Sequence, residues 1–133
     1  MSYASIQQAI EKQLITIPGL PAVNYENTDY SPVIDTPWLR VTHFPSENRP
    51  SGIGISAPNL YRGLTLVNVF YPARAGAKDA KAMVDLICSY FQKGTQLLED
   101  GLQIWISYSE ASGSSQEPNW FMIPVTIRWY CYV

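Results

Sequence analysis

The sequence predicts a single α+β domain over residues 1–133, in which two helices pack on one face of a mostly antiparallel β-sheet. Apolar residues recur every three or four positions in segments 3–17 and 77–91, a spacing typical of amphipathic helices. Strict alternation, as in strands, marks several other segments and is most regular in residues 120–133. A chain of 133 residues also matches the usual size of one domain with one core.

The first predicted helix covers residues 3–17. Ser2 or Ser5 can cap its start, and the Pro-Gly pair at residues 18–19 ends it. The proline-interrupted connection that follows leaves room only for a short strand at residues 22–25. The apolar stripe of this helix consists of Tyr3, Ile6, Ile10, Leu14 and Ile17.

Two strands come next. Pro37 opens the first, at residues 38–44, and a loop rich in Pro, Ser, Gly and Asn occupies residues 45–58. The second strand, residues 60–71, is apolar on both sides, which predicts a place in the middle of the sheet or under a subunit contact. One side of the first strand carries Leu39, Val41 and His43, and the other carries Trp38, Arg40, Thr42 and Phe44.

The second predicted helix, residues 77–91, has the stripe of a helix that lies on a sheet, and Gly94 is placed to end it. An Asp-Gly pair then joins residues 96–98 to residues 102–108, which predicts a β-hairpin. A polar loop follows at residues 110–119. The helix stripe consists of Ala80, Met83, Val84, Ile87, Cys88 and Phe91.

The last strand, residues 120–133, has two very different sides. The predicted core side consists of Phe121, Ile123, Val125, Ile127, Trp129, Cys131 and Val133. The other side carries Trp120, Met122, Thr126, Arg128, Tyr130 and Tyr132. Because this second side is too large and aromatic to be simply wetted, we expect a partner to cover part of it.

The composition favours an assembly subunit over a free monomer. Charged residues make up 15% of the chain, against a usual figure of about a quarter, while aromatic residues reach 13%. The formal net charge of −2 offers no overall attraction for nucleic acid or an anionic membrane, so neither is expected as a specific partner. The N-terminus lacks the pattern of a signal peptide, and no apolar run approaches the roughly 18 residues of a membrane span, so we expect a protein made in a cytoplasm.

The residues with catalytic potential do not form a recognisable site. His43 is the only histidine, and its sequence neighbours offer no thiol or carboxylate at triad or metal-ligand spacing. We therefore expect it to pair with a backbone carbonyl or a neighbouring side chain. Cys88 and Cys131 lie on predicted core faces, where they can approach each other, and we expect both to be buried free thiols rather than a disulfide or a metal site.

Three further patterns are weaker. Residues 52–57 match the spacing of a dinucleotide-binding turn, but Pro58 follows and the segment leads into a strand, so a flexible or partner-ordered loop is predicted. Glu99 and Asp100 are interpreted as solvated turn residues rather than an acid and base pair. A modest basic strip, a weak hint of nucleic-acid contact, can form from Arg49, Arg62, Arg74, Lys78 and Lys81. No catalytic, cofactor-binding or metal-binding residues are predicted.

Four packing motifs along the chain carry a resemblance to a known protein family. They are Thr-Pro-Trp-Leu-Arg-Val-Thr at residues 36–42, Gly-Leu-Thr-Leu-Val-Asn-Val-Phe-Tyr-Pro at 63–72, the alanine-rich helix with Asp85, and Trp-Phe-Met-Ile-Pro-Val-Thr-Ile-Arg-Trp at 120–129. Together they resemble the small tail terminator proteins of long-tailed, siphovirus-type bacteriophages, the group similar to the lambda minor tail protein that caps the tail tube.

The resemblance implies a structural protein of the virion tail and not an enzyme, present in the host cytoplasm during assembly. It implies a homohexameric ring that binds the end of the tail tube, stops further addition of tube protein and provides the surface that joins the head. The expected partners are therefore the chain itself, the tail tube protein and a head-completion or neck protein, with no cofactor.

A ring made by head-to-tail contacts needs two different patches on each subunit. We expect one patch on the outer strand face, with Arg128 and Tyr130 beside Arg40 of a neighbouring strand, and the other in the loops at residues 45–58 and 110–119. The candidate interface residues are Arg40, Glu47, Arg49, Leu66, Phe70, Arg128 and Tyr130.

Two other functions stay open at this stage. Another head-tail joining protein, such as a neck or completion subunit, would use the same kind of surface. A small-molecule binding module or an unrecognised enzyme would instead need a deep, closed pocket lined by polar groups.

Overall fold

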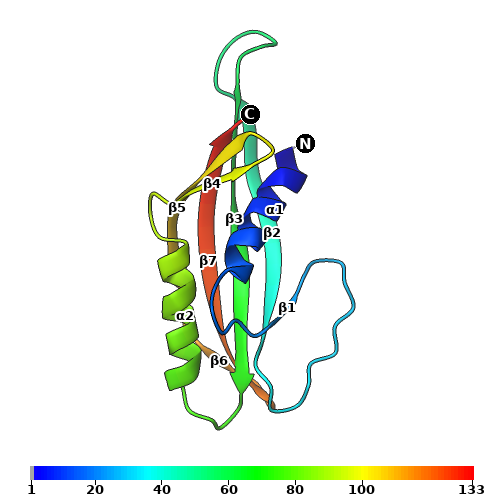
Figure 1. The fold of residues 1–133 in the computed structure, drawn as a ribbon, viewed down its shortest axis with the longest axis vertical. Coiled ribbons are helices and arrows are strands. Elements are labelled where there is room, and N and C mark those ends of the chain that lie inside the picture. Colours follow the sequence, from blue (N-terminus) through cyan, green and yellow to red (C-terminus); the bar gives the residue numbers. More distant parts are fainter. Residues whose placement is uncertain (1) are drawn as a thin grey trace.

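The computed structural model describes residues 2–133 and confirms the predicted α+β class, with two helices over a mostly antiparallel sheet (Figure 1). The helices are α1 (Ser2–Ile15) and α2 (Lys78–Tyr90). The strands are β1 (Ala22–Asn24), β2 (Trp38–Pro50), β3 (Asn59–Pro72), β4 (Gln96–Glu99), β5 (Leu102–Ala111), β6 (Ser115–Gln116) and β7 (Trp120–Tyr132).

The strands form one sheet in the order β1-β2-β3-β7-β5-β4, and β6 pairs with β7 outside this path. β1 runs parallel to β2, whereas the other neighbouring strands are antiparallel. The long strands β3 and β7 pair along almost their whole length in the middle of the sheet. The prediction that the strand with two apolar sides is central is therefore confirmed for β3.

Both helices lie on the same face of the sheet, which we call the helix face (Figure 1). α2 packs over β3, β7 and β5, while α1 packs over β4 and β5 and touches α2. Fully buried side chains fill the space between the layers, including Ile10 and Leu14 from α1, Ile87 from α2, and Val125 and Ile127 from β7. The opposite side of the sheet is called the outer face below.

The alternation of the last strand is confirmed with one exception. Its predicted core positions from Ile123 to Cys131 are buried under the helices, and Phe121 packs against the edge of this core. Val133 was also predicted to be in the core, but it is 41% exposed. It follows the last residue of β7, so its side chain lies at the margin of the core, while its backbone pairs with Asn59 through two hydrogen bonds of 2.8 Å.

Two strands are longer than their composition predicts. β2 continues to Pro50 instead of ending at residue 44, and β5 continues to Ala111 instead of residue 108. A register shift between Pro45 and Glu47 lets β2 keep its pairing with β3. Within residues 2–133, β1 covers only the first three residues of β2, so Pro45 lies on an open edge where a missing N–H breaks no ladder bond.

The first helix ends slightly earlier than predicted. α1 stops at Ile15, and a tighter turn carries the chain on, with the N–H of Ile17 donating to the carbonyl of Leu14 at 3.1 Å. Ile17 is still buried, as its place in the stripe predicts. Of the two serines expected to cap the helix, Ser5 is not the cap, because it lies inside α1 and is buried. The side chain of Ser2 lies outside the described part of the structure.

The predicted hairpin is confirmed between β4 and β5. Asp100 and Gly101 form its two-residue turn with φ values of 54° and 76°, the left-handed backbone that favours an Asp-Gly pair. The interpretation of these acids as solvated turn residues is corrected for Glu99, whereas Asp100 is exposed, as expected. The Glu99 side chain is only 11% exposed and forms an ion pair with Lys12 at 2.9 Å. Asp100 accepts a hydrogen bond from the Ser5 hydroxyl at 3.1 Å. Both contacts attach the turn to α1.

Candidate functional site

The outer face carries most of the predicted interface residues. Residues directly opposite each other in paired strands point to the same side of a sheet. Arg40 is opposite Asn68, Leu66 is opposite Thr126, and Tyr130 is opposite Arg62. The alternation predicted for β2, β3 and β7 therefore places their larger polar and aromatic residues together on the side of the sheet away from the helices.

An aromatic cluster occupies the end of the outer face near the start of β2. Trp38 stacks on Phe70 with ring centroids 4.1 Å apart, and Trp120 meets Trp38 edge-on at 6.0 Å. The Arg40 guanidinium lies over both stacked rings, 5.4 Å from the Trp38 centroid and 5.2 Å from that of Phe70. This contact is a cation–π interaction that holds an exposed charge in one position.

Phe70 does not have the free surface that the sequence predicts. It is 4% exposed, because Trp38 and Arg40 cover its ring within the same subunit. Phe70 can therefore support an interface but can hardly touch a partner itself. The surface that this cluster offers consists of the Arg40 head group and the edges of the neighbouring rings.

A groove crosses the opposite end of the outer face. Its volume is about 680 Å³ and it is open to solvent. Arg128 lies over the Tyr108 ring at 5.8 Å, and Tyr130 stacks on Trp105 at 6.4 Å. The groove is lined by Ser46, Glu47, Leu60, Arg62, Gly63, Ser107, Tyr108, Arg128, Trp129, Tyr130 and Tyr132.

Glu47 and Arg49 belong to this groove region and not to a separate loop. Both lie in the extended part of β2, opposite Arg62 and Leu60 of β3. The Glu47 carboxylate is 3.3 Å from Arg49 and 3.9 Å from Arg62, so it is shared by two exposed cations. Part of the predicted loop patch is therefore continuous with the outer face.

Two predicted neighbours are separated by a strand. Arg40 was expected beside Arg128 and Tyr130 on adjacent strands, but β3 lies between β2 and β7. Across the three strands β2, β3 and β7, Arg40 is level with Pro124, whereas Arg128 is level with Phe44. The outer face thus has two cationic areas, one at the aromatic cluster and one at the groove.

The predicted basic strip does not form. Arg49 and Arg62 lie on the outer face, Arg74 follows the far end of β3, and Lys78 and Lys81 are exposed on α2. α2 covers the other side of the sheet, so these cations point to different surfaces (Figure 1). No continuous track for a nucleic-acid backbone is present in this set.

The sequence did not predict that Tyr108 belongs to the groove. Strict alternation through β5 places Tyr108 on the same side as the buried Ile106. A register shift between these two residues turns Tyr108 to the outer face, opposite Arg128. The aromatic residues Trp105 and Tyr108, three positions apart, were the one sequence signal that both could face the same side. The bulge that brings this about depends on pairing with β7.

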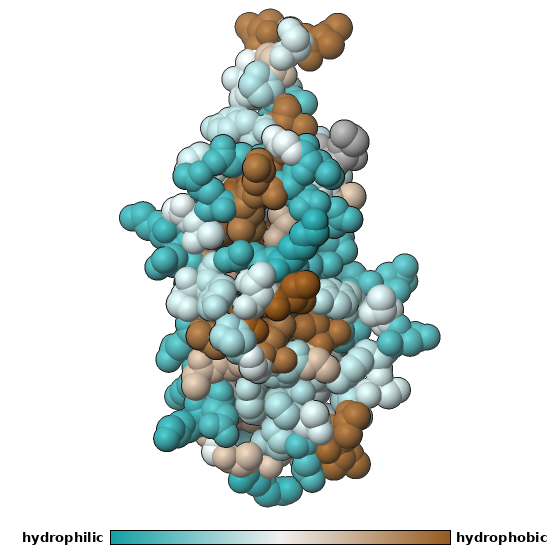
Figure 2. Space-filling view, viewed as in Figure 1, coloured by the Kyte–Doolittle hydropathy of each residue, from teal (hydrophilic) through white to brown (hydrophobic). Residues whose placement is uncertain are grey.

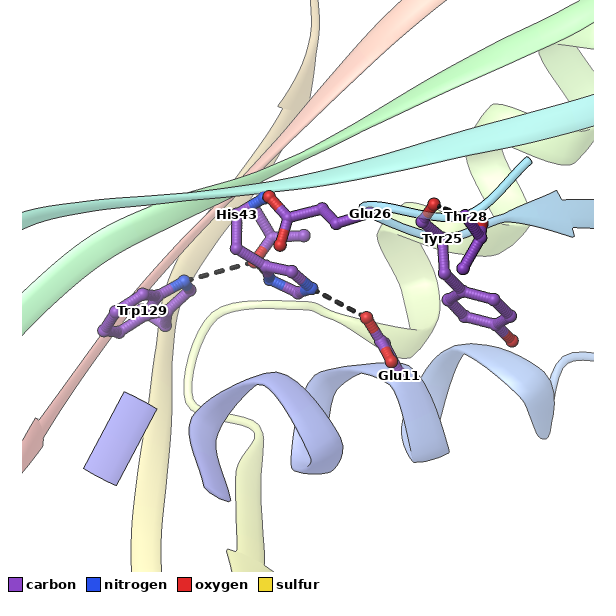
Figure 3. A network of polar contacts seen from close by, with 7 residues as sticks. Glu11, Tyr25, Glu26, Thr28, His43 and Trp129 are labelled. Carbon is purple, nitrogen blue, oxygen red and sulfur yellow. Dashed lines mark hydrogen bonds and ion pairs between the residues drawn. The ribbon is translucent and has the colours of Figure 1, made fainter. Parts of the chain in front are cut away.

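His43 connects α1 to the sheet through side chains from four segments (Figure 3). Its Nε2 is 2.9 Å from a Glu11 carboxylate oxygen, and its Nδ1 is 2.9 Å from the Thr65 hydroxyl. The Trp129 indole N–H donates to the same hydroxyl at 3.2 Å. The expectation that His43 pairs with a neighbouring side chain is confirmed.

This arrangement contains the residue types of a carboxylate, histidine and hydroxyl triad, but its position fits packing better than catalysis. Thr65 is fully buried, so its oxygen has no route to a substrate. In the neutral ring, Nε2–H donates to Glu11 and Nδ1 accepts from Thr65, which leaves the Thr65 oxygen free to accept from Trp129. Every member of the chain then has a partner within the protein.

A second carboxylate fixes the backbone beside His43. Glu26, in the turn after β1, accepts a 2.9 Å hydrogen bond from the His43 N–H (Figure 3). Thr28 steadies this turn by donating to the Tyr25 carbonyl at 2.7 Å. Burial, and next the nearby Glu11 charge, raise the pKa of Tyr25 above its usual value. The proline-interrupted connection is thus fastened to the open edge of β2.

The two cysteines are free thiols. Cys131 is fully buried on the helix face, and its burial raises its pKa from 9.0 to about 11. Cys88 was also expected to be buried, but it is only partly buried on α2, where it packs against the same core. A thiol with a raised pKa is protonated near neutral pH and is a poor nucleophile, so Cys131 is suited to packing.

No three His, Cys, Asp or Glu side chains within residues 2–133 gather where they could hold a metal ion. In the same part of the chain, neither helix is long and apolar enough to cross a membrane.

Comparison with known proteins identifies a family. A family model described as phage tail terminator protein matches residues 5–129. One solved structure, 22% identical, aligns with a TM-score of 0.78 over 100% of this chain and 96% of its own. A chain from the virion of a native gene transfer agent particle, 19% identical, aligns with a TM-score of 0.63 over 98% of this chain and 97% of its own. No curated protein sequence matches the chain.

Proposed function

We propose a ring-forming role from one premise: the chain belongs to the phage tail terminator family, whose model covers nearly all of it. The family is one of structural proteins and not of enzymes, so the chain is a structural protein of the virion tail. Within that role, the chain assembles as a homohexameric ring on the end of the tail tube. The ring stops the addition of further tube protein and provides the surface that joins the head.

The observation that carries this proposal is the uncovered outer face. One face of the sheet is buried by two helices, whereas the other presents exposed Arg40, Arg62 and Arg128 beside aromatic rings. Arginine and tyrosine are enriched in protein interfaces because they combine a flat apolar body with hydrogen-bonding groups. The outer face is therefore the first of the two patches that a closed ring requires.

The second patch is the exposed loop at residues 112–119. It includes β6, and its one charged residue is the acid Glu117, so its charge is opposite to that of the arginines on the outer face. Opposite charges on two different patches favour head-to-tail contacts between identical subunits over face-to-face pairs. A neighbour's loop then lies over the arginines of the next subunit, and the head-completion or neck protein and the tube bind the two rims of the ring.

Arg128→Glu tests the ring directly. We expect the variant to remain folded but to assemble at least about tenfold more weakly, because it reverses an exposed charge at the groove. Lys81→Glu makes the same charge change on the exposed side of α2 and is the matched control. Multi-angle light scattering over a concentration series measures the mass of both variants, and equal assembly of the two would remove Arg128 from the interface.

The position in the virion needs a different experiment. A phage that lacks this protein should make tails longer than normal, because tube growth is no longer stopped. Loss of a neck or completion protein, the other head-tail joining function considered, would instead leave normal-length tails unattached to heads. Electron microscopy of the null mutant distinguishes the two, and normal tail lengths would contradict the terminator assignment.

A small-molecule binding module is less well supported. The groove of about 680 Å³ is open and runs over a sheet surface, whereas sites for small ligands usually enclose most of the ligand. Its rim is also formed by long exposed side chains, including Arg62 and Arg128. These properties suit contact with another protein.

A further inference from the structure

The start of β7 folds back on β6 in a small hairpin at residues 115–122, which we call the finger. Hydrogen bonds fix its turn. The Glu117 N–H donates to the Trp120 carbonyl at 2.8 Å, and the Asn119 carbonyl accepts from the Ala73 N–H at 3.1 Å. Glu117 is the one charged residue of the finger and is exposed. The finger therefore presents a carboxylate on a turn that is already ordered, which lowers the entropy cost of binding.

The groove of the outer face has two arginines on neighbouring strands. Arg62 is opposite Tyr130 in the pairing of β3 with β7, so Arg62 and Arg128 are diagonal neighbours. Such neighbours are roughly 7–8 Å apart, which lets one carboxylate contact both guanidinium groups. Glu47 lies 3.9 Å from Arg62, and no carboxylate within residues 2–133 forms an ion pair with Arg128. The groove can therefore accept a carboxylate from another chain.

The groove suits the finger better than the second cationic area of the outer face does. It is a hollow of about 680 Å³, and its walls include Ser107 and Tyr132, whose hydroxyl groups can bond the backbone of an inserted turn. Arg40 instead lies over the rings of Trp38 and Phe70, as a single charge on a packed surface. Of the two areas, only the groove combines a recess with two cations.

The side of the molecule that bears the helices has a different surface. Figure 2 looks onto the helices and shows separate hydrophobic areas among hydrophilic residues. The Arg128 guanidinium lies on the other side of the sheet, over the Tyr108 ring. A chain that fills the groove therefore covers the outer face and leaves the helices uncovered.

We propose that the finger of one copy enters the groove of the next copy, where its Glu117 carboxylate bridges Arg62 and Arg128. This inference rests on the proposed function, in which neighbouring copies form a ring, and it names the residues that meet. Each copy has one finger and one groove, so contacts of this kind can continue until the ring closes.

The contact also orients the subunits. β7 begins in the finger and ends at the groove, so the two features lie toward opposite ends of the molecule (Figure 1). The end of one copy then lies beside the opposite end of the next. The long axis of each subunit is accordingly inclined to the axis of the ring.

An exchange of charges tests the pairing in the full chain. Glu117→Arg and Arg128→Glu should each weaken assembly at least about tenfold, because each brings like charges together. The double variant Glu117→Arg/Arg128→Glu should return to within about threefold of the wild type, because opposite charges meet again at every contact of the ring. Multi-angle light scattering over a concentration series measures assembly, and circular dichroism confirms that each variant is folded.

Two controls make the test specific. Asp85→Arg reverses an exposed acid on α2 and should leave assembly unchanged, in contrast to Glu117→Arg. The double variant Glu117→Arg/Arg40→Glu restores the balance of charge but places the new acid outside the groove. It should therefore stay as weak as Glu117→Arg alone.

Recovery in the Arg128 double variant, without recovery in the Arg40 one, supports the proposal. If both single variants assemble weakly and the Arg128 double variant does not recover, the finger does not enter the groove, although the ring itself stands. Assembly of Glu117→Arg equal to that of Asp85→Arg also overturns the pairing and leaves the groove to another protein of the tail or head. A wild-type protein that stays monomeric at every concentration would instead contradict the proposed function, and the pairing with it.

Discussion

Gly63 is the position at which the smallest added group should have the largest effect on the fold. A Cβ atom there would lie 2.5 Å from Cζ2 and 2.8 Å from Cη2 of Trp129, and 2.8 Å from the backbone oxygen of Phe44. Trp129 is buried in the core, and the Phe44 backbone is part of the β2–β3 ladder. Neither neighbour can retreat freely, so Gly63→Ala must displace the indole or open the ladder.

The expected cost follows from these contacts. Overpacking a core costs about 1–3 kcal/mol, and moving the indole breaks its hydrogen bond to Thr65, about 0.5–1.5 kcal/mol more. Replacing glycine restricts the unfolded chain and returns about 0.4–1 kcal/mol. We therefore expect Gly63→Ala to lower the free energy of unfolding by about 2–3 kcal/mol, which corresponds to roughly 10 °C in Tm for a domain of this size.

Urea unfolding followed by circular dichroism, at a fixed protein concentration, measures this loss. Gly113→Ala is the matched control, because an added Cβ at Gly113 meets nothing within 4 Å, and it should stay within about 0.5 kcal/mol of the wild type. Trp129→Phe removes the two clashing ring atoms, so Gly63→Ala should cost less in that background. A Gly63→Ala variant as stable as the wild type would refute the close contact between β3 and Trp129.

Three further predictions concern the core and its two cysteines. Thr65→Val should lower the free energy of unfolding by about 2–4 kcal/mol, because it leaves the buried Trp129 N–H and the His43 Nδ1 without a hydrogen-bond partner. The control Thr42→Val, on the outer face, should change the free energy of unfolding little. Equal effects of the two variants in urea unfolding would contradict this account of the network. Burial raises the pKa of the Cys131 thiol from 9.0 to about 11, so the unfolded chain releases this proton first and the free energy of unfolding should fall between those two pH values. Cys131→Val should reduce that fall, and an unaltered pH dependence would argue against the raised pKa. In the native protein a thiol reagent at mildly alkaline pH should modify Cys88 before Cys131, which is measured by mass spectrometry.

The sequence predicted the sides of the long strands well. Along β7, Ile127 and Trp129 are buried while Arg128 and Tyr130 face outward, as alternation requires. This pattern is readable because successive side chains of any strand point to opposite faces. The Asp-Gly hairpin was predictable for a similar local reason, since few residue pairs adopt its backbone readily.

Strand ends and bulges were not predictable from local preferences. Residues 45–50 have the composition of a loop, yet β3 holds them in a strand by pairing, with a register shift after Pro45. The shift before Tyr108 likewise exists only in relation to β7. Both shifts depend on hydrogen bonds to another strand, and the residues of one segment do not indicate which strand will pair with it.

The candidate surface was predicted in its residue types and only partly in its arrangement. Arg40, Arg128 and Tyr130 lie on the predicted face, but β3 separates the first from the other two. Phe70 was expected to be free, and Trp38 covers it. Alternation specifies a face, whereas strand order and side-chain stacking decide which residues on that face are neighbours and which are accessible.

The sequence by itself determined the two helices, the core stripes and a second strand face rich in large aromatic residues, because periodicity and composition are properties of the chain alone. Only the tertiary structure decided that Glu11, Glu26 and Thr65 surround His43, since they are 32, 17 and 22 residues away from it. It also decided that Ile53 and Ile55 stand alone at the end of a projecting hairpin. Long-range packing sets which groups are satisfied within the subunit, and so which are left for a partner.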